Sequence, residues 1–256
     1  MIHVLDGSFA ASISNDHALA SGLGSARRTP EAPMRIATIM LAAALAAPAA
    51  AEDRNPACEP GMLVFDASGS MKGTRIENAR IATARVLPAL TAERNVGLIT
   101  YGGEAGPECG TIRLQLEPAP NNGPAIQAVI NAIAPQGRTP LTEAVEQAAA
   151  LLGGGKRRAV IVLVTDGEEN CRGDPCALGQ RLRRAGGRLK VSVIGYRLRI
   201  SESSALSCLA SETGGLFVEV SETDELAKAL QDTLGCPPVS ALPTADQKAR
   251  FAVRRP

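Results

Sequence analysis

Histidine is almost absent from this sequence. The 256 residues include two, His3 and His17, and both lie upstream of a segment that we predict to be an export signal. Once that signal is removed, the mature chain contains no histidine. A Ser-His-Asp triad, a Cys-His pair and a histidine-ligated zinc site are then excluded. Much of hydrolytic and zinc-dependent catalysis is excluded with them.

Aromatic side chains and net charge are also scarce. Aromatic residues make up 2% of the chain, and tryptophan is missing, so there is little material for stacking on bases or sugars. The 27 basic and 26 acidic residues leave a formal net charge of +1. A nucleic-acid partner or a membrane surface held by bulk electrostatic attraction is therefore not expected. By contrast, 45% of the residues are apolar, which is enough for a sizeable core.

Residues 34–51 have the pattern of a signal peptide. A basic start at Met34-Arg35 precedes an apolar run over 36–45, and small residues at 49–51 supply a cleavage pattern. The apolar run is short for a membrane span, so no stable span is expected in the mature chain. A buried alanine-rich helix is the alternative. Residues 1–33 are expected to be a non-native or disordered extension, with Met34 rather than Met1 as the start; a long signal n-region would also fit.

Cysteine usage points to the same compartment. All six cysteines follow the predicted cleavage site, and the even number favours disulfides in an oxidising location. They are Cys58, Cys109, Cys171, Cys176, Cys208 and Cys236. The spacing Cys171-x4-Cys176 is not that of a zinc ribbon. The pairing stays open, although Cys58 with Cys236 is favoured because they bracket the domain. We expect a periplasmic or secreted protein.

Strands and helices are predicted to alternate from residue 58 to residue 236. Predicted strands lie at 62–65, 96–101, 111–116, 159–164, 190–196 and 216–220. Predicted helices lie at 76–90, 125–133, 141–152, 178–185, 201–213 and 221–234. Uninterrupted apolar strands are typical of parallel sheets covered on both faces. The pattern therefore predicts one α/β domain with a doubly wound, mostly parallel sheet and helices on both faces. Residues 237–256 are expected to be a disordered tail.

Oxygen-rich loops follow the predicted strands. Asp66, Ser68 and Ser70 come after the first, Asp166 ends the most hydrophobic one, and Thr139 precedes a helix. In such sheets, ligands bind at the carboxyl ends of strands. Carboxylates and hydroxyls without soft ligands suit a hard divalent cation. Alternate residues of an extended segment point the same way, so the first three side chains are expected to converge. The alternative is that the two aspartates merely cap helix N-termini and accept hydrogen bonds from loop amides.

This arrangement resembles the metal-ion-dependent adhesion site of von Willebrand factor type A domains. The resemblance covers residues 58–236 and implies one antiparallel edge strand in the sheet. It implies that Ser68, Ser70 and Thr139 contact the metal, and that Asp66 and Asp166 bind it directly or through water. The implied ion is Mg²⁺, with Mn²⁺ or Ca²⁺ as alternatives. The implied function is an adhesion or assembly module, not an enzyme, that captures an Asp or Glu carboxylate of a protein partner.

Two other functions compete with this one. A metal-assisted phosphohydrolase would use an Asp nucleophile with a second Asp two residues later, or a base over the metal. Here Ser68 holds that second position and no histidine is available. Glu168 and Glu169 are candidate acid or base groups, although glutamates beside a metal loop are more often solvated or supporting groups. The third possibility is a disulfide-stapled structural envelope protein in which metal only adds stability.

Overall fold

A computed structural model describes residues 58–103, 109–167, 169–199 and 203–237. The predicted signal peptide, the extension before it and the predicted tail beyond residue 237 lie outside the described residues. Within the described ranges, no helix has both the length and the apolar character needed to cross a membrane.

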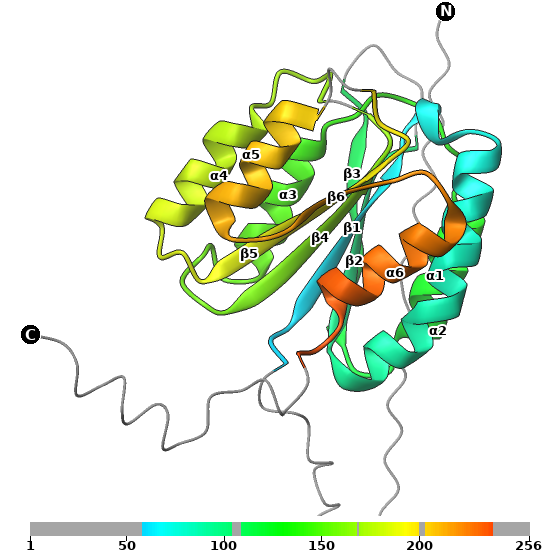
Figure 1. The fold of residues 1–256 in the computed structure, drawn as a ribbon, viewed down its shortest axis with the longest axis horizontal. Helices are drawn as coiled ribbons and strands as arrows, with labels where there is room; N and C mark the ends of the chain where they lie inside the picture. The colour runs from blue at the N-terminus through cyan, green and yellow to red at the C-terminus, as the bar shows by residue number, and fades with distance from the viewer. Residues whose placement is uncertain (1–57, 104–108, 168, 200–202, 238–256) are drawn as a thin grey trace, which may run out of the picture. The chain divides into compact units, whose positions relative to one another are not determined.

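Strands and helices alternate along the chain as predicted (Figure 1). The strands are β1 (Gly61–Ala67), β2 (Val96–Gly102), β3 (Thr111–Ala119), β4 (Ala159–Thr165), β5 (Leu189–Tyr196) and β6 (Phe217–Val220). The helices are α1 (Thr74–Glu93), α2 (Gly123–Ala132), α3 (Leu141–Leu151), α4 (Pro175–Arg184), α5 (Ser203–Thr213) and α6 (Thr223–Leu234). A short 3-10 helix, η1, spans Gly69–Met71. α4 begins at Pro175, three residues before the predicted start at residue 178. Asp174 caps this helix, and Pro175 occupies its first turn.

The six strands form one sheet in the order β3-β2-β1-β4-β5-β6. β1 pairs in parallel with β2 and β4, and β4, β5 and β6 continue the parallel arrangement. β3 runs antiparallel to β2 at one edge. The doubly wound, mostly parallel sheet and its antiparallel edge strand are thus confirmed.

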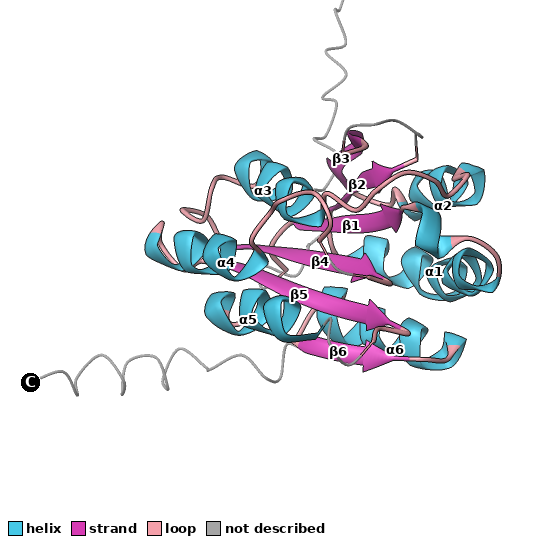
Figure 2. Cartoon of the chain, turned by 90° about the horizontal axis from the view of Figure 1, so that it is seen from above, coloured by secondary structure: helices cyan, strands magenta, loops and turns pink. Residues whose placement is uncertain are grey.

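Helices cover both faces of the sheet, three on each (Figure 2). α1, α2 and α6 pack on one face, where they meet the Leu63 and Phe65 side chains of β1. α3, α4 and α5 pack on the other, where they meet Met62 and Val64. All four of these side chains are fully buried. Burial on both faces explains why the parallel strands are continuously apolar rather than alternating.

Three disulfides pair all six cysteines, as the even number predicted. Cys58–Cys236 joins the two ends of the domain across a Cα–Cα distance of 5.4 Å, which is the pairing that the bracketing positions favoured. Cys109–Cys171 joins the β2–β3 connection to the segment after β4. Cys176–Cys208 joins α4 to α5.

Because β1 and β4 are parallel neighbours, their carboxyl ends lie side by side. The loops that start at Asp66 and at Asp166 therefore emerge at the same edge of the sheet, which is where the sequence predicts a ligand site.

Candidate metal centre

Asp66 lies at the end of β1 with its carboxylate fully buried. Its Oδ1 accepts a hydrogen bond from the backbone N–H of Ser68 at 2.8 Å, and its Oδ2 accepts one from the hydroxyl of Thr165 at 2.8 Å. Burial raises the pKa of Asp66, although the hydrogen bonds from Ser68 and Thr165 oppose that rise. The carboxylate is fixed in direction and held in a place where its negative charge is costly.

Ser68 and Ser70 converge, but not by the predicted geometry. The chain is extended at Ser68 and then turns into η1, so Ser70 does not continue the alternation of a strand. The turn nevertheless brings the Ser68 and Ser70 hydroxyl oxygens to 2.9 Å from each other. Ser70 donates its proton to Asp166 Oδ1 at 2.6 Å, so Ser68 is the donor to Ser70. A directed chain of hydroxyls thus ends on the second carboxylate.

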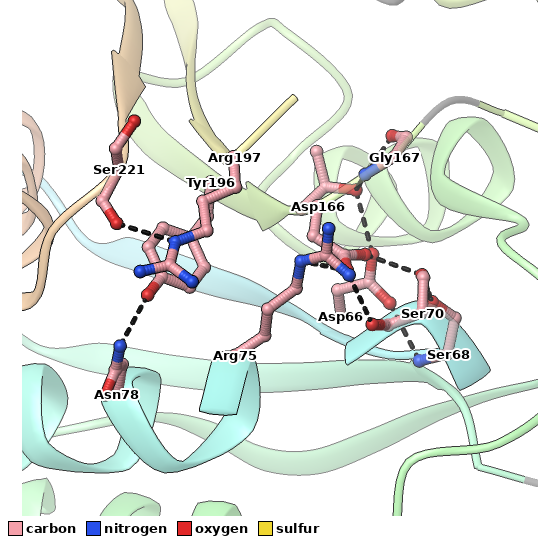
Figure 3. A network of polar contacts seen from close by, with 11 residues as sticks. Asp66, Ser68, Ser70, Arg75, Asn78, Asp166, Gly167, Tyr196, Arg197 and Ser221 are labelled. Atoms are coloured by element: carbon pink, nitrogen blue, oxygen red, sulfur yellow. Dashed lines mark hydrogen bonds and ion pairs between the residues drawn. The ribbon is translucent and has the colours of Figure 1, made fainter. Parts of the chain in front are cut away.

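Asp166 follows β4, and its side chain is buried. Its Oδ2 has no hydrogen-bond partner among the described residues, although Arg75 Nε lies 3.3 Å away as an ion pair (Figure 3). Burial and then the charge of Asp66 raise the pKa of Asp166 to about 6, against the opposing effects of Ser70 and Arg75. Burial therefore disfavours the charged form of both carboxylates, and the charge of Asp66 further disfavours that of Asp166, so a bound cation would be favourable here.

Thr139 lies in a loop that is attached to the end of β1. Gln136 donates its N–H to the Ala67 carbonyl at 3.0 Å, and Gly69 donates its N–H to the Gly137 carbonyl at 3.1 Å. Thr139 itself is buried. The structure therefore joins Ser68, Ser70 and Asp166 in one hydrogen-bonded chain, orients Asp66 through the same turn, and places the Thr139 loop against that turn.

The sequence analysis did not identify Gly102, whose backbone packs against the turn that carries Ser68. Gly102 ends β2 with a φ of 84°, and a Cβ built there would lie 2.7 Å from the backbone nitrogen of Ser68. Glycine is thus required both by the backbone conformation and by the close approach of the Ser68 backbone. The signal was present in the sequence as two successive glycines, Gly102 and Gly103, directly after a buried strand.

Glu169, which the sequence left open as an acid or base, instead holds two loops together. Its Oε1 accepts the N–H of Cys171 and its Oε2 accepts the N–H of Thr142, each at 2.7 Å. Both carboxylate oxygens are committed to backbone donors, which is the arrangement of a structural group. Glu168, the other candidate, lies outside the described residues.

The donor set fits a hard divalent cation. Hydroxyl and carboxylate oxygens converge, and one buried carboxylate oxygen lacks a hydrogen bond. Throughout the part of the chain that the structure describes, no three His, Cys, Asp or Glu side chains group to hold a metal. Any cation at this edge would therefore depend on serine and threonine hydroxyls for part of its coordination.

Comparison with known proteins decides the family. The model of the von Willebrand factor type A domain matches residues 62–233. The chain belongs to this family. The matched residues run from the first strand to the last helix and include every residue of the candidate site.

In sequence, the chain is similar to the uncharacterized protein YwmD of Bacillus subtilis, with 26% identity over 204 residues, which is 74% of this chain and 91% of YwmD. It is also similar to the inter-alpha-trypsin inhibitor heavy chain H4 of Bos taurus, with 28% identity over 67% of this chain and 19% of the heavy chain. The chain thus spans a small part of that larger protein.

Among solved structures, the fold is similar to that of an aerotolerance-related membrane protein from Bacteroides fragilis. The TM-score is 0.51 at 20% identity, over 69% of this chain and 98% of the other. At this identity the likeness shows a shared fold and nothing more specific.

Proposed function

We propose that this domain binds a divalent cation, Mg²⁺ in the first place, at Asp66, Ser68, Ser70, Thr139 and Asp166, and uses it to capture a carboxylate of a protein partner. The observation that carries the proposal is the convergence of two buried carboxylates and two serine hydroxyls, with Asp166 Oδ2 lacking a hydrogen bond. Buried charges of like sign are costly unless a counter-ion compensates them.

Each side chain has a distinct task in this proposal. Ser68, Ser70 and Thr139 supply neutral oxygens, which leave most of the cation's charge uncompensated. Asp66, whose two oxygens already accept hydrogen bonds from Ser68 and Thr165, acts through water. Asp166 offers its Oδ2 directly or through water. The bound cation supplies a positive charge with an open coordination position, which an Asp or Glu side chain of the partner fills.

The family supports a protein-interaction module, and the oxygen donors of the site support a metal-dependent interaction. The three disulfides fit an oxidising compartment. With the signal pattern at residues 34–51, they support a periplasmic or secreted location. We propose the domain boundaries accordingly, with residues 58–236 as the folded part, residues 34–51 as the signal, and terminal segments outside both.

Catalysis is not part of the proposal. A phosphohydrolase would need a nucleophile or a base beside the cation. Asp66 is engaged by two hydrogen bonds and Glu169 by two backbone N–H groups. A purely structural role for the metal makes a different prediction, namely that the cation stabilises the fold without creating any affinity for carboxylates.

The test is Mn²⁺-dependent capture of a carboxylate probe. Water-proton relaxation of the Mn²⁺-loaded protein reports water in the open coordination position. Titration with N-acetylglutamate amide should displace that water and lower the relaxation rate, whereas N-acetylglutamine amide should leave it unchanged. Equal effects of the two probes, or no effect of either on a protein that binds Mn²⁺, would leave only the structural role for the metal.

A further inference from the structure

The Thr139 loop lies between two segments that a disulfide joins. On one side, a Cβ built on Gly110, the residue after Cys109, would lie 3.6 Å from the Arg138 carbonyl oxygen. On the other side, the segment after β4 carries Glu169, Asn170 and Cys171. Cys109–Cys171 closes this arrangement, with a Cα–Cα distance of 5.3 Å across 62 residues of sequence.

Asn170 makes three hydrogen bonds with Thr139. Its Oδ1 accepts the N–H of Thr139 at 2.7 Å, and its Nδ2 donates to the Thr139 hydroxyl at 3.4 Å. Its own backbone N–H donates to the Thr139 carbonyl at 3.4 Å, and its carbonyl accepts a hydrogen bond from the Arg138 guanidinium. Asn170 thus contacts the backbone and the side chain of the predicted metal ligand at the same time.

The segment that carries Asn170 has no regular secondary structure of its own. Its position depends on Glu169, which receives the N–H of Thr142 in the first turn of α3, and on the disulfide at Cys171. A cross-link between distant parts of a chain limits the conformations that a loop of this kind can adopt. Without it, Asn170 would be held by hydrogen bonds alone at a partly exposed edge.

We propose that the Cys109–Cys171 disulfide and Asn170 are positioning groups for the metal site: they fix the Thr139 hydroxyl in the direction that a cation at Asp66 and Asp166 requires. The part of this proposal that concerns metal affinity rests on the proposed function. The clamp, by which we mean the Cys109–Cys171 disulfide together with the hydrogen bonds between Asn170 and Thr139, is a property of the metal-free protein. Groups that hydrogen-bond to a metal ligand without contacting the metal typically lower metal affinity about 10- to 100-fold when they are removed.

The experiment compares two double variants of the full chain, each lacking one disulfide. Cys109→Ser/Cys171→Ser opens the clamp. Cys176→Ser/Cys208→Ser is the matched control, because it removes a cross-link between α4 and α5. Two quantities are measured: amide hydrogen exchange at Thr139 and Thr142 in the metal-free protein, and Mn²⁺ affinity by calorimetry. Asn170→Ala, with all disulfides intact, is the third variant. If Cys109→Ser/Cys171→Ser does not fold, Asn170→Ala tests the positioning of Thr139 by itself.

The expected result for the clamp variant is faster exchange at both amides and Mn²⁺ affinity lowered by about 10- to 100-fold. Asn170→Ala should show the same direction at Thr139, and the control should match the wild type in both measurements. Unchanged exchange at Thr139 in both the clamp variant and Asn170→Ala would overturn the proposal, as would faster exchange with unchanged Mn²⁺ affinity. A wild type that takes up no Mn²⁺ would contradict the proposed function, and the exchange rates would then decide the clamp by themselves.

Discussion

Arg75 Nε lies 3.3 Å from Asp166 Oδ2, and Arg75 Nη1 donates to the Ser70 carbonyl at 3.1 Å (Figure 3). Arg75 belongs to the first turn of α1, directly after the turn that carries both serines. A positively charged side chain of the protein itself is therefore already placed beside the buried carboxylate of Asp166. It lowers the pKa of Asp166, against the larger effect of burial.

We predict that Arg75→Gln strengthens metal binding. The guanidinium repels a divalent cation at the same carboxylate, and its removal should tighten Mn²⁺ binding by roughly three- to tenfold, since the partly exposed side chain is screened by solvent. Calorimetric titration of the metal-stripped protein measures the change. Arg85→Gln is the control, because Arg85 also lies on α1 and makes an ion pair, but an exposed one, with Asp224 of α6. Weaker binding in Arg75→Gln would show that Arg75 supports the site rather than competing with the metal.

The metal-free protein should lose stability as pH rises from about 4 to about 6. The pKa of Asp166 is raised to about 6 in the folded state, so folding favours the protonated form. This contribution to stability is present below the pKa of the unfolded chain and is lost as pH rises through the folded value. Asp66, whose pKa is also raised, acts in the same direction.

Urea unfolding at pH 4.5 and pH 7 measures this effect in the wild type and in Asp166→Asn, which cannot titrate at that position. The loss of stability should be smaller in Asp166→Asn, and saturating Mg²⁺ should reduce it in the wild type. An identical pH dependence in the two proteins would mean that Asp166 does not carry the effect.

Gly102→Ala should impair the metal site more than the fold. The added Cβ would lie 2.7 Å from the Ser68 nitrogen, and the positive φ is unfavourable for alanine. The turn that carries Ser68 must shift, so Mn²⁺ affinity should fall at least about tenfold. Gly154→Ala is the control for backbone strain alone, because Gly154 also has a positive φ but has open space around its Cβ position. Equal Mn²⁺ affinity in the two variants would contradict the role of Gly102.

Arg94→Met should destabilise the domain by about 2–4 kcal/mol. The buried guanidinium donates to the carbonyl oxygens of Leu234, Gly235 and Glu59, and so connects both ends of the domain near the Cys58–Cys236 disulfide. Burial lowers the pKa of Arg94. Methionine fills much of the volume but leaves three acceptors without their donor. Denaturant unfolding measures the loss. A change below about 0.5 kcal/mol, as expected for an exposed residue, would show that water replaces these bonds.

The sequence was most informative where one physical pattern dominated. Continuous apolar runs identified the parallel strands, and the parallel pairing of β1 with β4 then placed Asp66 and Asp166 at one edge of the sheet. These steps need no knowledge of side-chain contacts. The pairing of Cys58 with Cys236 followed from their positions at the two ends of the same domain.

The rest of the site depends on contacts between loops, which no local pattern encodes. Ser70 reaches Ser68 through a 3-10 turn rather than through an extended strand. Asn170 reaches Thr139 across 31 positions of sequence, and Arg75 reaches Asp166 across a larger separation. Such pairs could be recognised only after the sheet order had brought their loops together.

The measurement that tests the central claim most directly is calorimetric titration of Mg²⁺ and Mn²⁺ into the metal-stripped protein, beside Asp66→Ala and the exposed control Asp224→Ala. Saturable binding at one site in the wild type and in Asp224→Ala, with loss of binding in a folded Asp66→Ala, is the predicted result. Affinity retained in Asp66→Ala, or no binding in the wild type, would contradict the assignment of a metal site to this edge of the sheet.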